Sequence, residues 1–348
     1  APFVETEWGG EIYSIMCALK EVIDPNNLLN PGVIINKDKS AHIQHLKDLP
    51  QVEEEVDKCM ECGFCEHRCP SRDITMTPRQ RIVVRRELIK LKSTGKQAVH
   101  NELLNQYKYD GMDTCAVDGL CAEACPVDIN TGMLIKRLRK ENHNAFSNRI
   151  AVLIAKNFAV VAWSVKNGIR IGNGVNKLLG RNTMRRITGG LKSVIPSMPL
   201  WSNQLKATNT VQRPAIVQTE SRSVVYYPTC ISRAMGGNIG STTTVLDSFM
   251  RVAAKSGVTC ILPNNIAGSC CGQPFSSKGF NEAYAIMANK TISLLWEWTK
   301  EGTIPIVVDI TACTHTLQTC APVLTAENSK RFKAMKIIDS IEFISDFL

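Results

Sequence analysis

Residues 59–70 read CMECGFCEHRCP, and their four cysteines follow the pattern C-x2-C-x2-C-x3-C-P. Gaps of two residues let three thiolates close around one face of a cubane cluster, namely those of Cys59, Cys62 and Cys65. The fourth cysteine, Cys69, precedes a proline and is expected to bind a second cluster. Zinc usually takes two separated pairs of ligands, and haem attachment needs C-x-x-C-H, where this chain has Glu66 after the third cysteine. The stretch therefore predicts two iron–sulfur clusters.

A second run, CAVDGLCAEACP at residues 115–126, keeps the same frame with one cysteine replaced. Asp118 occupies the second ligand position, and the remaining positions are Cys115, Cys121 and Cys125. With the crossed ligation of two-cluster ferredoxins, Cys125 would complete the first cluster. Cys69 would then join Cys115 and Cys121 at the second cluster, where one iron lacks a thiolate.

Three outcomes are open at that iron. Asp118 could bind it through a carboxylate oxygen, although a carboxylate is a harder ligand than a thiolate and should hold iron more weakly. Alternatively the iron is lost and a 3Fe-4S cluster remains. In the third case Asp118 faces solvent and another group fills the corner. Because Asp118 is in register with Cys62, we favour an Asp-linked or labile corner.

A third cysteine group lies in the last third of the chain. Cys230 follows an apolar run, Cys270 and Cys271 are adjacent and precede a glycine, and Cys313 and Cys320 come later in ACTHTLQTC. Adjacent cysteines cannot easily share a normal disulfide, so the group suits a metal or cluster held in a loop. We interpret the two remaining cysteines, Cys17 and Cys260, as buried structural thiols and His315 as a structural residue.

Composition and charge limit the classes of protein that are possible. The 348 residues are 44% hydrophobic and 21% charged, which is typical of soluble globular domains, and no stretch of 18 apolar residues predicts a membrane-spanning helix. Fourteen closely spaced cysteines fit metal sites in a reducing compartment better than a disulfide framework. We therefore expect a cytoplasmic protein. Since the chain starts at Ala1 and ends inside a predicted helix, we also expect it to be part of a longer one.

Lys and Arg outnumber Asp and Glu by 41 to 32, which gives a net charge of +9. This balance favours acidic partners, including the inner face of a cell membrane, with the basic linker at 148–171 as the contact; otherwise it is a solvated basic face. Nucleic acid is not an expected partner. Four arginines follow the first cysteine run and either offset cluster charge or form a solvated helix: Arg79, Arg81, Arg85 and Arg86.

The pattern along the chain predicts an α+β multidomain protein. We expect a compact piece at 1–36, a charged connector at 37–58, a helical two-cluster domain at 59–140, a basic linker at 141–221 and an α/β domain at 222–348. Helices are predicted over residues 10–22, 79–91, 97–107, 148–171, 242–255, 281–298 and the last 12 residues. Buried parallel strands are predicted at 224–227, 258–262 and 304–308, a short strand at 33–35, and extended chain at 189–203.

Two segments resemble known families. DPNNLLNPG, within residues 11–33, resembles the closing segment of FAD-linked oxidases of the D-lactate dehydrogenase type. The third cysteine group resembles the CCG cysteine-rich domain of heterodisulfide reductases and of glycolate and glycerol-3-phosphate dehydrogenase iron–sulfur subunits. In that family these cysteines can hold a further cluster. The family often closes with C-x2-C, whereas Thr316 stands at that place here and Cys320 follows later.

The three modules in this order resemble the large bacterial FAD- and iron–sulfur-containing D-2-hydroxyacid dehydrogenases. The resemblance implies that FAD, bound upstream, takes a hydride from D-lactate or D-2-hydroxyglutarate. Electrons then pass through two 4Fe-4S clusters to a quinone or cytochrome. The implied catalytic residues lie upstream of Ala1, so none is assigned and the chain alone is not expected to oxidise substrate.

Two other functions are kept as alternatives. A separate electron-transfer subunit, of a glycolate oxidase, glycerol-3-phosphate dehydrogenase or heterodisulfide reductase type complex, would have no reason to carry DPNNLLNPG. A zinc-stabilised interaction module would lack the visible absorbance of iron–sulfur clusters.

Overall fold

The computed structural model describes residues 3–44, 46, 49–195, 198–208, 222–235 and 243–347. Its N-terminal part contains α1 (Val4–Trp8) and α2 (Gly10–Ile23). Asp24 ends α2 as expected, because its carboxylate accepts hydrogen bonds from the backbone N–H groups of Leu28 and Leu29. Residues 33–35 form bends instead of the predicted strand, so that prediction is wrong; no neighbouring strand pairs with them in the described chain.

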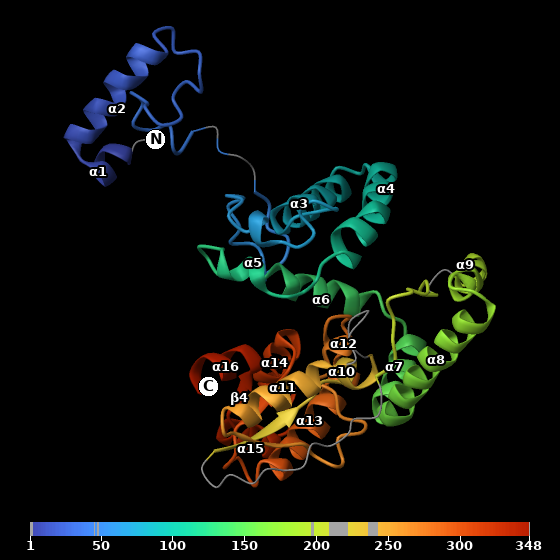
Figure 1. Ribbon diagram of the computed structural model, residues 1–348. Coiled ribbons are helices and arrows are strands. Elements are labelled where there is room, and N and C mark those ends of the chain that lie inside the picture. The colour runs from blue at the N-terminus through green and yellow to red at the C-terminus, as the bar shows by residue number, and fades with distance from the viewer. Residues whose placement is uncertain are drawn as a thin grey trace.

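The next part of the chain is helical and forms the middle of the molecule (Figure 1). Its elements are η1 (Glu66–Arg68), α3 (Pro78–Ser93), α4 (Gln97–Tyr107), a π-helical turn η2 (Lys108–Asp113), α5 (Leu120–Glu123) and α6 (Thr131–Glu141). The helices predicted at 79–91 and 97–107 are confirmed as α3 and α4. Thr77 and Gln80 form a capping box at the start of α3, where Pro78 occupies the first turn. Ile82, Leu134 and Ile135 are fully buried between α3 and α6.

The predicted basic linker is helical over most of its length. It forms α7 (Ala145–Lys156), α8 (Phe158–Leu179) and α9 (Thr183–Val194). The predicted helix at 148–171 is therefore two helices, broken at Asn157 and bent by 86°. The prediction of extended chain at 189–203 is wrong up to Val194, because α9 continues through Gly189 and Gly190 and ends at Val194. No single helix in the described chain is long and apolar enough to cross a membrane; only the bent α7–α8 pair meets that test by length and composition.

The C-terminal domain is built on a four-stranded, wholly parallel sheet in the order β2-β1-β3-β4. The strands are β1 (Ser223–Tyr227), β2 (Thr259–Ile261), β3 (Ile306–Val308) and β4 (Ile337–Asp339). The connecting helices are α10 (Cys230–Ala234), α11 (Val245–Lys255), α12 (Gln273–Ser276), α13 (Asn281–Trp298), α14 (Thr311–Gln318), η3 (Ala321–Val323), α15 (Ala326–Ala334) and α16 (Ser340–Phe347). The three predicted strands and their parallel arrangement are confirmed, whereas β4 was expected to be part of the last helix.

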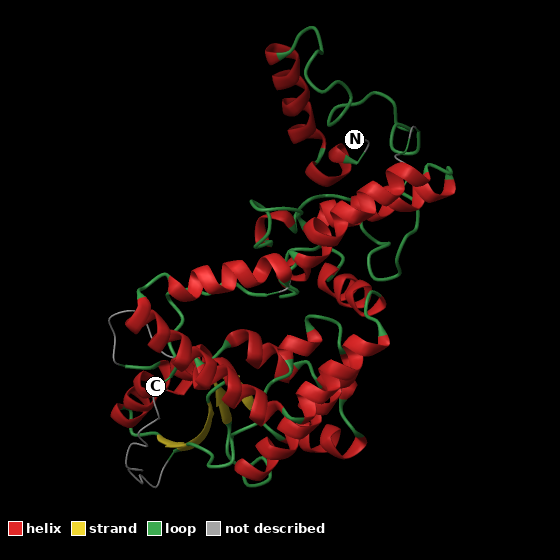
Figure 2. Cartoon of the chain, turned by 90° about the vertical axis from the view of Figure 1, so that its right-hand side faces the viewer, coloured by secondary structure: helices red, strands yellow, loops and turns green. Residues whose placement is uncertain are grey.

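Helices cover both faces of this sheet (Figure 2). Val225, Tyr227 and Val308 point to one core, which they share with α7 and α13. Val224 and Tyr226 point to the other core, with α11 and α16. Alternation of the strand side chains between two buried faces explains why the predicted strands read as continuous apolar runs. The α+β multidomain prediction is thus confirmed.

Candidate metal centres

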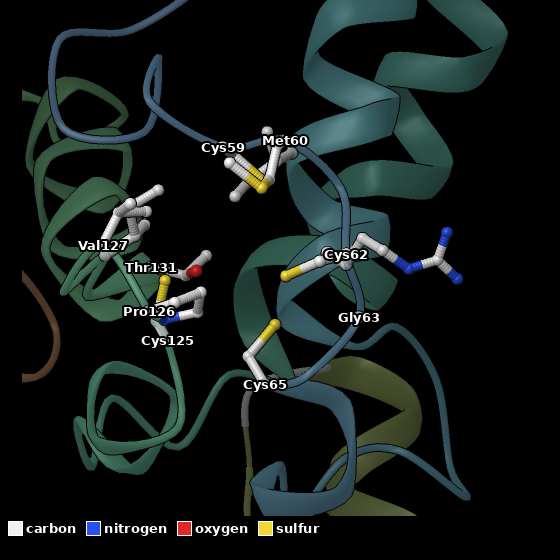
Figure 3. Close-up of a pocket in the computed structure, with 12 residues that line it drawn as sticks. Cys59, Met60, Cys62, Gly63, Cys65, Cys125, Pro126, Val127 and Thr131 are labelled. Carbon is white, nitrogen blue, oxygen red and sulfur yellow. The ribbon is translucent and has the colours of Figure 1, made fainter. Parts of the chain in front are cut away.

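Four cysteines from the two ferredoxin-like runs surround one cavity. The thiols of Cys59, Cys62, Cys65 and Cys125 point toward the same space, as Figure 3 shows. Most of the other lining side chains are apolar, among them Met60, Ile82, Val127 and Ile129, and Arg79 and Thr131 are the polar ones. Four soft thiolates that converge on one mainly apolar cavity are the donor set of a cubane cluster, so the residues fit the first predicted 4Fe-4S group.

Backbone and side-chain contacts hold the first cysteine loop in shape. Gly63 has a left-handed φ of +86°, which only glycine adopts without strain. The N–H of Glu61 lies 3.4 Å from the Cys59 sulfur. Arg86, buried on α3, donates 2.7 Å to the Glu61 carboxylate and 2.8 Å to the Cys59 carbonyl oxygen. Burial raises the pKa of Cys65 to about 11, so binding to a metal must displace a proton from this thiol.

The remaining cysteines of the two runs, Cys69, Cys115 and Cys121, are linked by their proximity to Arg81 and to one another. Arg81, only 1% exposed, donates to the Cys69 sulfur at 3.6 Å and to the Gly111 carbonyl oxygen at 2.7 Å. Burial raises the pKa of Cys115, and the nearby guanidinium of Arg81 opposes that shift. Cys121 is close enough to Cys115 to raise its pKa further. Cys69, Cys115 and Cys121 therefore share one neighbourhood, as the crossed arrangement requires, and they fit a second cluster.

Asp118 lies in the loop between Cys115 and Cys121 and is exposed. Its Oδ1 accepts a hydrogen bond from the N–H of Leu120 at 3.2 Å. This hydrogen bond does not test whether Asp118 binds iron, so ligation by Asp118 stays a prediction.

The four arginines after the first run do not form a solvated face. Arg81 and Arg86 are buried against the cysteine loops. Arg79 pairs with Glu66 at 3.0 Å, and Arg85 pairs with Glu53. Sequence reasoning missed a further buried arginine, Arg139 on α6. The signal that could have indicated it is its spacing, because Arg139 lies four residues, or about one helical turn, after the buried Ile135 on α6.

Arg139 connects the second cysteine run to the C-terminal domain. It donates 2.9 Å to the Cys115 carbonyl oxygen, and also to that of Met112, while its other amino group donates 2.5 Å to the carbonyl oxygen of Ser277. Gly279 lies so close to α6 that a Cβ there would be 2.6 Å from the Lys140 nitrogen. The two domains are thus in direct backbone contact beside the second site.

In the C-terminal domain, four of the five predicted cysteines form a continuous row. The sulfurs of Cys230 and Cys270 are 3.6 Å apart, Cys270 neighbours Cys271, and Cys271 bonds with Cys313. Cys230 follows β1 and Cys313 follows β3, so the row lies at the carboxyl edge of the sheet, where ligands of open α/β sheets bind. The hydrogen bond with Cys270 and then burial raise the pKa of Cys230.

Cys320 is fully buried and forms no described hydrogen bond to this row; burial, followed by the nearby Cys320 and Cys271, raises the pKa of the Tyr284 hydroxyl. Thr316, in the place of the family's cysteine, is buried and donates 2.6 Å to Gln273 Oε1. His315 is exposed, and Cys260 is buried in β2 as expected. Cys17 is only partly buried, so its predicted burial is incomplete.

Across the residues with described positions, no three His, Cys, Asp or Glu side chains are grouped so that they could hold a single metal ion. A cubane cluster distributes its protein ligands over separate irons and does not need such a group.

Comparisons with known families agree with these sites. Residues 55–129 match a 4Fe-4S dicluster domain, residues 1–34 match the C-terminal domain of FAD-linked oxidases, and residues 224–318 match a cysteine-rich domain. These are domains of an FAD-linked iron–sulfur oxidoreductase. The predicted electron-transfer character, with iron–sulfur and FAD cofactors, is confirmed at this level. No curated protein and no solved structure matches the chain significantly.

Proposed function

We propose that this chain is the electron-transfer portion of an FAD-dependent D-2-hydroxyacid dehydrogenase, acting on D-lactate or D-2-hydroxyglutarate. Electrons from the flavin would leave through two 4Fe-4S clusters to a quinone or cytochrome. The convergence of four thiols from two separate runs on one cavity carries the electron-transfer part. The substrate class is supported by the resemblance of DPNNLLNPG to D-lactate-type oxidases.

The ligands divide between two clusters. Cys59, Cys62, Cys65 and Cys125 would hold the first, and Cys69, Cys115 and Cys121 the second. When bound, such clusters transfer one electron at a time. The chain's own residues shape both sites: Arg86 fixes the Cys59 loop, and Arg81 places a positive charge and an N–H donor at Cys69. The charge and donor that Arg81 supplies stabilise extra negative charge and should raise the reduction potential of the second cluster.

The contact between the two domains supports the C-terminal cysteine row as the site that receives electrons from the second cluster. Arg139 donates hydrogen bonds to the carbonyl oxygens of both Cys115 and Ser277, and Ser277 is six residues after Cys271. We propose that Cys230, Cys270, Cys271 and Cys313 hold a further cluster, or form the site from which electrons pass to the acceptor. Cys320 would be an alternative ligand.

A separate iron–sulfur subunit of a glycolate oxidase, glycerol-3-phosphate dehydrogenase or heterodisulfide reductase type complex is the second candidate. The cysteine-rich domain at 224–318 favours it. The match of residues 1–34 to an FAD-linked oxidase domain supports the first candidate instead.

The test is iron and sulfide analysis with EPR on protein prepared without oxygen, before and after dithionite. About seven to eight irons per chain, with magnetically coupled signals from two reduced clusters, are expected. About twelve irons would add a cluster in the cysteine-rich domain. Stoichiometric zinc with little iron would overturn the proposal. In the Cys125→Ser variant the first cluster should be lost, whereas Cys17→Ser serves as the control and should keep both.

A further inference from the structure

The two cysteine runs are structural copies of one another, 56 residues apart. The second residue after each leading cysteine is a non-glycine residue with left-handed φ, +61° at Glu61 and +57° at Val117. Two positions later comes a left-handed glycine, with φ of +86° at Gly63 and +81° at Gly119. Left-handed non-glycine residues are uncommon, so the coincidence shows that the two loops follow the same path.

Backbone hydrogen bonds repeat with the same offset. The N–H of Glu66 donates to Gly63 at 3.0 Å, and that of Ala122 to Gly119 at 2.9 Å. The N–H of Cys69 donates to Glu66 at 3.1 Å, and that of Cys125 to Ala122 at 3.0 Å. Asp118 therefore stands where Cys62 stands in the first loop, and both side chains are exposed.

We propose that Asp118 binds the fourth iron of the second cluster through its carboxylate, and that this iron is exchangeable. The inference rests on the proposed clusters. One oxygen of Asp118 accepts the N–H of Leu120, which leaves the second oxygen available to a metal. No ion pair involves Asp118 in the described part of the chain. Because carboxylate holds iron more weakly than thiolate does, this corner is the first to lose its metal.

Loss of that iron is a balanced redox step. One-electron oxidation of [4Fe-4S]2+ gives [3Fe-4S]+ and Fe2+, and the electron reduces the oxidant. Ferricyanide is the one-electron oxidant used in the test, and it becomes ferrocyanide. The hydrogen bond from the N–H of Leu120 to Asp118 does not depend on that iron.

Three variants separate ligation from turn formation. Asp118→Cys places a thiolate at the position that Cys62 occupies in the first loop. Asp118→Asn keeps an oxygen acceptor for the N–H of Leu120 but removes the negative charge. Cys62→Ser weakens the equivalent corner of the first cluster and controls for cluster identity. Each is oxidised with ferricyanide and measured by three-iron EPR signal and by Fe2+ released to a ferrous chelator.

The wild type is expected to give about one three-iron spin and one Fe2+ per chain, and Asp118→Cys about a tenth of each. Asp118→Asn should give the three-iron form at a lower concentration of ferricyanide than the wild type does. Asp118→Asn behaving as wild type, or no three-iron signal in the wild type under any oxidation, would overturn the inference. Failure of the proposed function would give a different result from failure of this inference, because the wild type would then contain too little iron for two clusters.

A second observation, independent of the first, concerns the helical linker. Residues 145–195 contain no Asp or Glu and carry nine cations: Arg149, Lys156, Lys166, Arg170, Lys177, Arg181, Arg185, Arg186 and Lys192. None of them forms an ion pair with a carboxylate in the part of the chain that the structure describes. This segment therefore carries as much positive charge as the whole chain has in excess.

Helix α8 combines this charge with an uncovered apolar stripe. Val160, Trp163, Ile171 and Leu178 recur at helical spacing on one face and are between 63% and 84% exposed. Lys166, Arg170 and Lys177 run beside this stripe. The opposite face is packed, because the ring of Trp201 lies against Gly172. Figure 1 shows α8 and α9 at one side of the molecule.

We also infer that α8 and α9 dock on an anionic lipid surface. Aromatic and aliphatic side chains beside cations on one face are the features of helices that lie in the membrane interface. The uncompensated charge selects negatively charged headgroups over a neutral partner surface.

Vesicles of phosphatidylcholine with and without phosphatidylglycerol provide the test, by flotation of the cluster-loaded protein. Binding to the anionic vesicles should be at least about tenfold stronger and should fall with salt. Trp163→Ala and Arg170→Glu/Lys177→Glu should lose it, whereas Lys330→Glu/Lys333→Glu on α15 should not. Equal loss in the α15 control, no binding by the wild type, or dimerisation that depends on Trp163 would overturn the inference. Iron content checks that each variant is loaded.

Discussion

Buried arginines, more than acidic residues, shape the surroundings of the cysteine loops. Arg81, Arg86 and Arg139 are each at most 5% exposed, and all three donate to backbone carbonyl oxygens of the cysteine-bearing segments. A guanidinium offers five donors in a fixed plane, so one side chain can hold several carbonyl groups together. The sequence indicated the first two through their place after the first run, whereas Arg139 could be found only from its position one turn after the buried Ile135 on α6.

Replacement of Arg139 by lysine tests this role. An ammonium cannot reach the carbonyl oxygens of Met112, Cys115 and Ser277 together, so we expect a loss of about 2 kcal/mol in unfolding free energy. The EPR signal of the second cluster should change while that of the first does not. Arg72→Lys, at an exposed site, is the control. Equal stability and unchanged spectra in both variants would contradict the role.

Two cysteines outside the proposed centres should differ in reactivity. Burial raises the pKa of Cys260 from its ordinary value of 9.0 to about 12, while Cys17 is partly exposed. Because the folded state disfavours the Cys260 thiolate, the contribution of this group to stability decreases as pH rises above about 9. At pH 8, iodoacetamide should modify Cys17 and spare Cys260 until the protein is unfolded. Peptide mass spectrometry measures both, and equal rates would contradict the burial of Cys260.

At the scale of elements, periodicity and length decided which predictions succeeded. The bounds of α4 and α13 agree with the prediction because both helices have clear apolar spacing. β4 was missed because two apolar residues and an aspartate directly before a helix cannot be distinguished from its first turn. The break at Asn157 depends on α7 packing against α13, a tertiary contact that local sequence does not contain. The repeat of loop conformation around Asp118 was predicted only as a register of ligand positions.

The contact between α6 and residues 277–280 depends on one glycine. Gly279 has φ of +84°, and a Cβ there would lie 2.6 Å from the Lys140 nitrogen and 2.8 Å from the Lys136 carbonyl oxygen. Gly279→Ala should therefore cost about 3 kcal/mol, from backbone strain and overpacking together. Gly95→Ala, with φ of +72° and open space around it, should cost only about 1 kcal/mol. Chemical denaturation of both variants measures the difference, and equal costs would mean that the close contact is unimportant.

At the scale of the whole molecule, the α/β domain and the dicluster domain differ in what stabilises them. The former has two apolar cores around a sheet. The latter has one small core of ten buried residues beside its cysteines. Small domains with few buried residues often depend on bound metal for stability. The order of the three modules was visible in the sequence, whereas their contact through α6 was not.

Removal of iron should therefore affect the two domains unequally. After chelation under reducing conditions, backbone amides of α3 and α6 are expected to exchange hydrogen faster, while those of β1 and β3 remain protected. Hydrogen exchange with mass spectrometry measures both regions in one sample. Uniform loss of protection would show that the whole molecule, and not only the dicluster domain, requires its metal.

The absence of a side chain at Gly279 has a kinetic consequence. Backbone touches backbone where α6 meets the C-terminal domain, and Arg139 and the stacked rings of His143 and Phe280 leave that joint little freedom. When electron carriers lie on mobile domains, the rate of electron transfer falls in viscous solvents because each transfer waits for a diffusive domain motion. Here the distance between the second centre and the cysteine row is fixed, so we expect the transfer rate between them to be independent of solvent viscosity.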